Sequence, residues 1–183
     1  MSLLDVRNAI VATLTAKLGP NVSVQPHRGR FDNAQEIQRF ATKAPAVLVA
    51  ALRVQRADDM GGISRLPVQW GIFVITKDEP KLPRDQGAIG LVETILMLTP
   101  DNDWGGQSVG AVSNLDARNL YAQQVDSLGI ALWGIGFEQP IEEPLLSDAE
   151  YAALNPFLTF HQDIDMAPAD GVIDITETDT LPQ

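Results

Sequence analysis

Cysteine is absent from this 183-residue chain, and histidine occurs only at His27 and His161. The absence of cysteine excludes a disulfide framework, a cysteine nucleophile and any thiolate metal site. A zinc site or a Ser-His-Asp triad would need one of the two imidazoles beside suitable partners. Neither histidine has neighbours at a metal-ligand spacing, and His161-Gln162-Asp163 comes nearest. We therefore interpret both histidines as ordinary surface or interface residues.

Long apolar runs are also missing. The longest apolar helical candidate, Gly87 to Leu98, contains Glu93 and is shorter than the roughly 18 residues of a membrane span. The first residues, Met1 to Arg7, are too mixed for a signal peptide, which needs a basic start and then an apolar run. Hydrophobic residues nevertheless make up 45% of the chain, which is enough for a packed core. We expect a soluble protein with no membrane partner.

Basic residues are missing from the last third of the chain. Residues 1–118 contain all 13 Lys and Arg and 12 of the 24 acidic residues, so their net charge is +1. Residues 119–183 contain the other 12 acidic residues, so their net charge is −12. Phosphate contacts need a basic face, so sequence-specific nucleic-acid binding is not expected. The acidic third has three interpretations: it repels DNA, attracts a basic partner, or keeps a flexible end solvated.

Motifs for chemistry are missing as well. Gly61-Gly62 and Gly105-Gly106 are not followed by the Gly-Lys-Ser or Gly-Lys-Thr of a phosphate-binding loop, and no Gly-x-Ser-x-Gly elbow occurs. Asp101 and Asp103 lack the glutamate that a calcium loop requires, and they are typical of a turn. We predict no catalytic residue, no cofactor, no metal site and no enzymatic activity.

Two segments have the apolar spacing of main helices. Residues 3–18 follow Ser2, a potential cap, and end at Gly19-Pro20. Residues 86–98 carry a stripe that we expect to face the core, formed by Ile89, Val92, Ile95 and Leu96. A short helix is also predicted over residues 32–40, where Asp32 and Gln35 resemble a capping pair.

Three segments alternate like strands. Residues 44–55 are apolar on both faces, with Leu48, Ala50, Leu52 and Val54 on one of them, which predicts a central strand covered on two sides. Residues 66–75 and 130–139 alternate in the same way. The first two segments form a long hairpin whose turn is Asp58 to Gly62. Shorter strands are expected over 21–25 and 117–121.

These elements predict an α+β fold: an antiparallel (mixed) sheet with a long β-hairpin, flanked by two main helices. We assign residues 1–140 to this domain. Residues 141–183 have too few apolar residues for a core of their own and are interpreted as an acidic C-terminal extension or arm. We expect this arm to reach across an adjacent subunit or onto a partner, ordered around its apolar pieces.

Ten residues are candidates for contact with other subunits or partners. Arg28, Arg30 and Phe31 lie in a basic loop suited to an acidic partner, since Arg is favoured at interfaces. Trp104 lies in a polar glycine loop, and it covers its indole either on its own core or on another subunit. The remaining candidates are at the hairpin tip (Asp58, Asp59, Met60) and in the extension (Phe157, Leu158, Phe160).

The order helix, long hairpin, helix, final strand resembles the tail-terminator proteins of tailed phages, in particular the Mu-like branch of contractile-tailed phages and prophages. The segments that carry the resemblance are Arg7 to Leu14, Ala44 to Val49 and Gly129 to Ile135. The resemblance implies a ring, usually of six subunits, that caps the tail tube, stops growth of tube and sheath, and presents a surface to the head. The implied partners are further copies of the chain, the tail tube protein and, beyond these, sheath and head-completion proteins.

The implied location is the head-proximal end of the virion tail, after assembly in the host cytoplasm. Two alternatives remain open from the sequence. Another phage structural component, of the neck or the baseplate, would have the same composition. An enzyme of unfamiliar type would require a deep polar pocket around His27 or His161.

Overall fold

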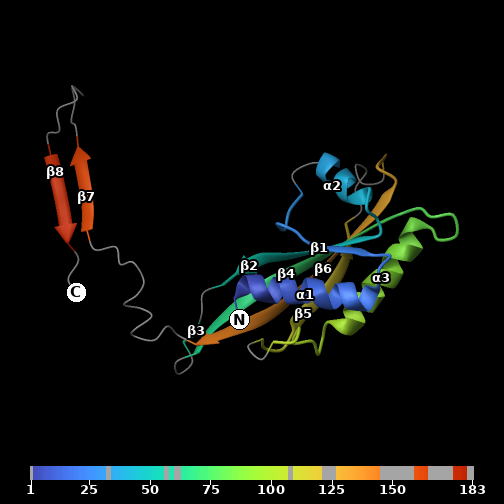
Figure 1. Cartoon of the computed structure of the whole chain (residues 1–183), viewed down its shortest axis with the longest axis horizontal. Helices are drawn as coiled ribbons and strands as arrows, with labels where there is room; N and C mark the ends of the chain where they lie inside the picture. The colour runs from blue at the N-terminus through green and yellow to red at the C-terminus, as the bar shows by residue number, and fades with distance from the viewer. Residues whose placement is uncertain are drawn as a thin grey trace. The chain divides into compact units, whose positions relative to one another are not determined.

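The structure is a computed structural model of the whole chain (Figure 1). It describes residues 2–31, 34–55, 58–59, 63–106, 109–120, 127–144, 159–164 and 175–180. The chain divides into two compact units, residues 1–144 and residues 145–183, which are described separately below.

The first unit is built on a mixed sheet in the strand order β1-β2-β4-β6-β5 (Figure 1). β1 runs parallel to β2, and the other neighbours are antiparallel. The predicted hairpin of 44–55 with 66–75 is confirmed, with Ala46 opposite Ile75 and Val54 opposite Val68. The strands are β1 (Ser23–Pro26), β2 (Ala46–Val54), β3 (Asp58–Asp59), β4 (Ile63–Lys77), β5 (Ser113–Asn119) and β6 (Ile130–Pro144).

Three helices accompany the sheet: α1 (Leu3–Leu18), α2 (Ala34–Ala41) and α3 (Arg84–Leu98). The predicted cap of α1 is present, because the Ser2 hydroxyl accepts a hydrogen bond from the Asp5 backbone N–H at 3.2 Å and the Asp5 carboxylate accepts one from the Ser2 N–H at 3.0 Å. Asp32, the predicted cap of α2, lies outside the described residues.

The two sides of the sheet are covered by different helices. α1 and α3 pack on one side, where Val6, Ile10, Val92 and Ile95 join Trp70 and other sheet residues in the main core cluster. α2 packs on the opposite side, where Ala41 joins a smaller cluster with Leu48, Ile75 and Leu132. We call these the α1/α3 side and the α2 side. The predicted α+β class with a mixed sheet and two main helices is therefore correct.

The final strand of the sheet is longer than the sequence predicts. β6 continues past Gln139 and Pro140 to Pro144, paired with β4 as far as Ile63. Ile141 is 1% exposed and belongs to the main core, and Arg65 donates two hydrogen bonds to Glu142, the shorter at 2.7 Å. Pro140 does not end the strand: it lies opposite Pro67 of β4, and its carbonyl accepts a hydrogen bond from the Gly110 N–H at 2.8 Å. The amino-acid composition changes after Pro140, but the sheet continues to Pro144.

The second unit contains a two-stranded antiparallel sheet that the sequence analysis did not predict. It consists of β7 (Thr159–Ile164) and β8 (Ile175–Thr180), with Thr159 opposite Thr180 and Ile164 opposite Ile175. The sequence signal for β8 was the alternation of apolar and polar residues after Val172.

Candidate functional surfaces

The loop that begins at Pro26 is folded onto the sheet. His27 is only 8% exposed, and its ring lies 4.7 Å from Phe31, 5.2 Å from Phe40 and 5.9 Å from Phe73. Its Nδ1 accepts a hydrogen bond from the Gly29 N–H at 3.1 Å. The interpretation of His27 as a surface residue was therefore wrong, because Phe40 and Phe73, which come from other elements of the fold, pack around it together with the nearby Phe31.

The surroundings of His27 favour its neutral form. Burial lowers the pKa of the imidazole, the Glu36 carboxylate raises it to a lesser extent, and Arg28 lowers it further. The His27 Nε2 has no hydrogen-bond partner among the described residues, and it lies 3.8 Å from the Glu36 Oε1. The imidazole thus packs among three aromatic rings in surroundings that favour its neutral form.

The predicted interface residues of this loop attach α2 to the sheet. Arg28 donates from Nη2 to both carboxylate oxygens of Glu36, at 2.8 and 2.9 Å, and Glu36 lies in α2. Phe31 is half-buried and packs edge-on against Phe73 of β4, with ring centres 5.2 Å apart. Arg30 also has a partner within the chain. The loop thus has contacts that the sequence analysis did not assign to it.

Trp104 covers its indole on its own core, which is one of the two alternatives open from the sequence. The residue is 3% exposed, its Nε1 donates to the Gln139 side-chain oxygen at 2.7 Å, and its ring packs 6.2 Å from Phe137. Gln139 in turn donates to the carbonyls of Asn102 and Gly110, at 2.9 and 2.8 Å. This satisfied network fastens the segment after α3 to β6, so Trp104 is not a surface residue.

The other predicted interface residues are only partly described. Asp58 and Asp59, predicted to lie in a turn, form β3 and pair with Arg65 and Ser64 of β4. Phe160 lies in β7. Met60, Phe157 and Leu158 are outside the described residues.

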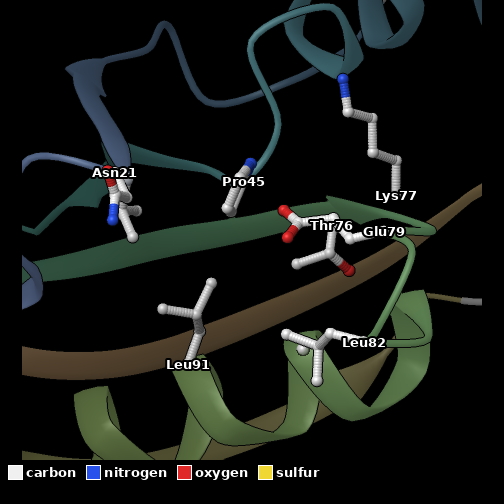
Figure 2. A pocket seen from close by; sticks show the side chains of 9 residues that line it. Asn21, Pro45, Thr76, Lys77, Glu79, Leu82 and Leu91 are labelled. Atoms are coloured by element: carbon white, nitrogen blue, oxygen red, sulfur yellow. The ribbon is translucent and has the colours of Figure 1, made fainter.

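A hollow of about 470 Å³ opens beside the start of α3. Leu82 and Leu91 approach it from the α3 side, and Asn21 and Pro45 lie across from them (Figure 2). The hydroxyl of Thr76, in its wall, already donates to the Arg84 carbonyl at 2.6 Å. No histidine lines this hollow, which is formed by Asn21, Val22, Pro45, Thr76, Lys77, Glu79, Leu82, Gly87 and Leu91.

The structure exposes apolar residues that the sequence analysis placed inside. Ile89, assigned to the buried stripe of α3, is 51% exposed. Met97 of the same helix, which was not part of that predicted stripe, is 78% exposed. Leu52 and Val54 are 43% and 45% exposed, although their strand was expected to be covered on both sides. The exposure of some apolar residues of α3 could have been predicted from the sequence. Apolar residues occur all around this helix, and one sheet cannot cover them all.

The described residues offer neither a metal-binding cluster nor a membrane-spanning helix. Within the described parts of the chain, no group of three or more His, Asp or Glu side chains is placed to hold a metal ion. Among those same residues, no helix has both the length and the apolar content needed to cross a bilayer. No protein-family model matches the chain, and no curated protein sequence matches it.

Proposed function

We propose that this chain is a structural phage protein, a tail terminator that forms a ring, with six subunits as the expected number, on the head-proximal end of the tail tube. In this role it stops growth of the tube and sheath and provides the surface to which the head attaches. Its partners are further copies of itself and the tail tube protein.

The observation that carries the proposal is where the resembling segments lie in the fold. Arg7 to Leu14 belongs to α1, Ala44 to Val49 leads into β2, and Gly129 to Ile135 begins β6. These segments are distant in the sequence, yet their buried residues meet in the main core cluster as Ile10, Leu14, Val47, Val49 and Ile135. The resemblance therefore concerns one connected framework, which supports a likeness of fold over a chance likeness of short segments.

The proposal is tested by removing the protein from the phage or prophage that encodes it. An early stop codon in the gene should give tails of uncontrolled length that lack heads, because nothing stops addition of tube subunits. Electron microscopy of negatively stained lysates measures the length distribution, and expression of the chain from a plasmid should restore one length. Full-length tails without heads would identify a neck component instead, and normal infectious particles would contradict any essential tail role.

A further inference from the structure

The residues that follow β1 lie close against β2. The His27 N–H donates to the Val49 carbonyl at 2.7 Å, and the Gly29 N–H donates to the His27 Nδ1 at 3.1 Å. Gly29 has a φ of +102°, and a Cβ added to it would be 3.0 Å from the Leu52 Cδ2. We call residues 27–31 the His27 loop. Its position on β2 therefore depends on the close approach of Gly29 and on the bond that His27 accepts from it.

The hydrogen bond from Gly29 determines which ring nitrogen of His27 carries the hydrogen. An imidazole nitrogen that accepts a hydrogen bond has no hydrogen of its own, so the neutral ring carries its hydrogen on Nε2. Nε2 lies 3.8 Å from the Glu36 Oε1 and has no hydrogen-bond partner among the described residues. A second proton is therefore added at Nδ1, which is the atom that holds the Gly29 N–H.

Proton uptake at Nδ1 and closure of the His27 loop compete with each other. Once Nδ1 carries a hydrogen it is a donor, and it faces the Gly29 N–H, which is also a donor, at 3.1 Å. The Gly29 N–H then loses its acceptor. The side chain of His27 is only 3% exposed, so the new charge reaches water only if the loop moves. The charged ring therefore favours an open loop over the closed one.

The charged groups around the ring do not offset its burial. Burial has the largest effect and lowers the pKa of His27; Glu36 of α2 opposes this effect, and Arg28 of the loop adds to it. Arg28 also donates to both oxygens of Glu36, at 2.8 and 2.9 Å, so this carboxylate already binds one cation in the closed loop. From β4, the group that packs against the imidazole is the uncharged ring of Phe73. The closed loop thus holds the neutral ring better than the charged one.

We propose that His27 is a proton-sensitive switch: when Nδ1 takes up a proton, the His27 loop leaves β2 while the sheet stays folded. α2 loses part of its attachment at the same time, because Arg28 of the loop binds Glu36 and the His27 ring packs 5.2 Å from Phe40. Among the described members of the main core cluster none comes from this loop, so the cluster keeps its packing. Opening makes the aromatic rings around His27 accessible. This inference goes beyond the proposed function and does not depend on it.

The position of the hydrogen on the neutral ring is measured by nitrogen NMR of the full chain with labelled histidine. The chain has only two histidines, so the variant His161→Asn assigns the signals of His27. At neutral pH, Nδ1 of His27 should have the chemical shift of a nitrogen without hydrogen, and Nε2 that of a nitrogen with hydrogen. A hydrogen on Nδ1 at this pH would overturn the proposal, because Nδ1 could not then accept the Gly29 N–H.

Opening of the loop is measured by hydrogen–deuterium exchange, corrected for the intrinsic effect of pH on exchange. From neutral pH to about pH 5, the peptide that contains Gly29 should lose protection by up to about tenfold per pH unit, because opening is linked to the uptake of one proton. A peptide from β4 should keep its protection. A loop that stays protected at pH 5, with or without a proton on His27, would overturn the proposal. An equal loss of protection in β4 would also overturn it, since the whole unit would then be unfolding.

Two variants separate proton uptake from loop opening. His27→Asn does not titrate, so the protection of its loop should be the same at every pH in this range. Gly29→Ala should open the loop already at neutral pH, because its Cβ meets Leu52 and its positive φ is strained, and its exchange should also be independent of pH. The matched control His161→Asn should behave like the parent protein, and circular dichroism should show that all variants remain folded. A pH dependence in His27→Asn equal to that of the parent would contradict the assignment of the switch to His27.

Discussion

At the scale of single residues, His27 shows how packing decides the chemistry of a side chain. Its ring is held by Phe31, Phe40 and Phe73, and Glu36 is the nearest acidic group. Burial disfavours the charged imidazolium more strongly than Glu36 favours it, so the pKa of His27 lies below the ordinary value of 6.5. The residue therefore joins α2 to the sheet best when it is neutral.

The stability of the fold should depend on pH through His27. Because the folded protein has the lower pKa, the unfolded chain binds the proton first as the pH falls, and the free energy of unfolding should decrease below about pH 6.5. The stabilisation that neutral His27 gives to the folded state is fully present above that pH, and it is lost as the pH falls towards the pKa of His27 in the folded protein. Urea unfolding at several pH values between about 7.5 and 5.5 measures the slope.

The variant His27→Asn keeps an acceptor for the Gly29 N–H but does not titrate, so it should be less stable overall and show a flatter pH dependence. His161→Asn serves as the control for the other histidine and should keep the slope of the parent protein. An unchanged slope in His27→Asn would show that another group is responsible.

At the scale of elements, α3 contains glycine where a helix gains from a side chain. Gly90 lies within the helix, and a Cβ at this position would meet no atom within 4 Å. Gly105, in the loop after α3, also has open space, but its φ is +75°, a conformation that side chains rarely adopt. The same substitution therefore has opposite consequences at these two positions.

We predict that Gly90→Ala raises the free energy of unfolding by about 0.5–1 kcal/mol, because alanine loses less backbone entropy in a helix. Gly105→Ala should lower it by about 1–2 kcal/mol, because a Cβ is strained at positive φ. Chemical unfolding of both variants beside the parent protein measures the two differences. If both substitutions changed the free energy of unfolding in the same direction, the space around the added Cβ, and not the backbone conformation, would determine the effect of alanine at these positions.

At the scale of the whole molecule, the end of β6 determines where the chain can be shortened. Ile141 belongs to the main core, and Arg65 binds Glu142 across the β4–β6 pair. The described members of both core clusters come from residues 1–141. A deletion that starts after Pro140 therefore damages the sheet, whereas a deletion that starts after Pro144 leaves this unit whole.

We predict that the fragment 1–144 keeps the thermal unfolding midpoint of the full chain within a few degrees. The fragment 1–140 should lose at least about 2 kcal/mol, because it lacks a buried isoleucine and the last part of a strand. Differential scanning calorimetry compares the three proteins. Equal stability of the two fragments would contradict the role given to Ile141.

The same fragment tests the arm hypothesis for the acidic C-terminal part. If that part reaches across a neighbouring subunit, the fragment 1–144 should fold but fail to restore tail length in cells that lack the full-length protein. Restoration of tail length and of infectious particles at normal yield would show that the arm has no role in assembly.

The main elements could be read from the sequence because local periodicity specifies them. The alternation in 44–55 and 66–75, the helical spacing of residues 3–18 and the Ser2 cap all depend on neighbours within a few residues, and all appear in the structure. Leu52 and Ile89 were misplaced for the same reason. A bulge shifts the register of β2 near Leu52, and one sheet cannot cover every apolar residue of α3.

By itself, the sequence determined the α+β class, the long hairpin, the two main helices and the uneven distribution of charge. Only the tertiary structure decided that Trp104 is buried against Gln139, that His27 lies among three aromatic rings, and that β6 continues through Pro140. It also placed Ile89 and Leu52 at the surface on opposite sides of one sheet. These outcomes depend on contacts between segments far apart in the sequence, and burial is a property of such contacts, which no local pattern contains.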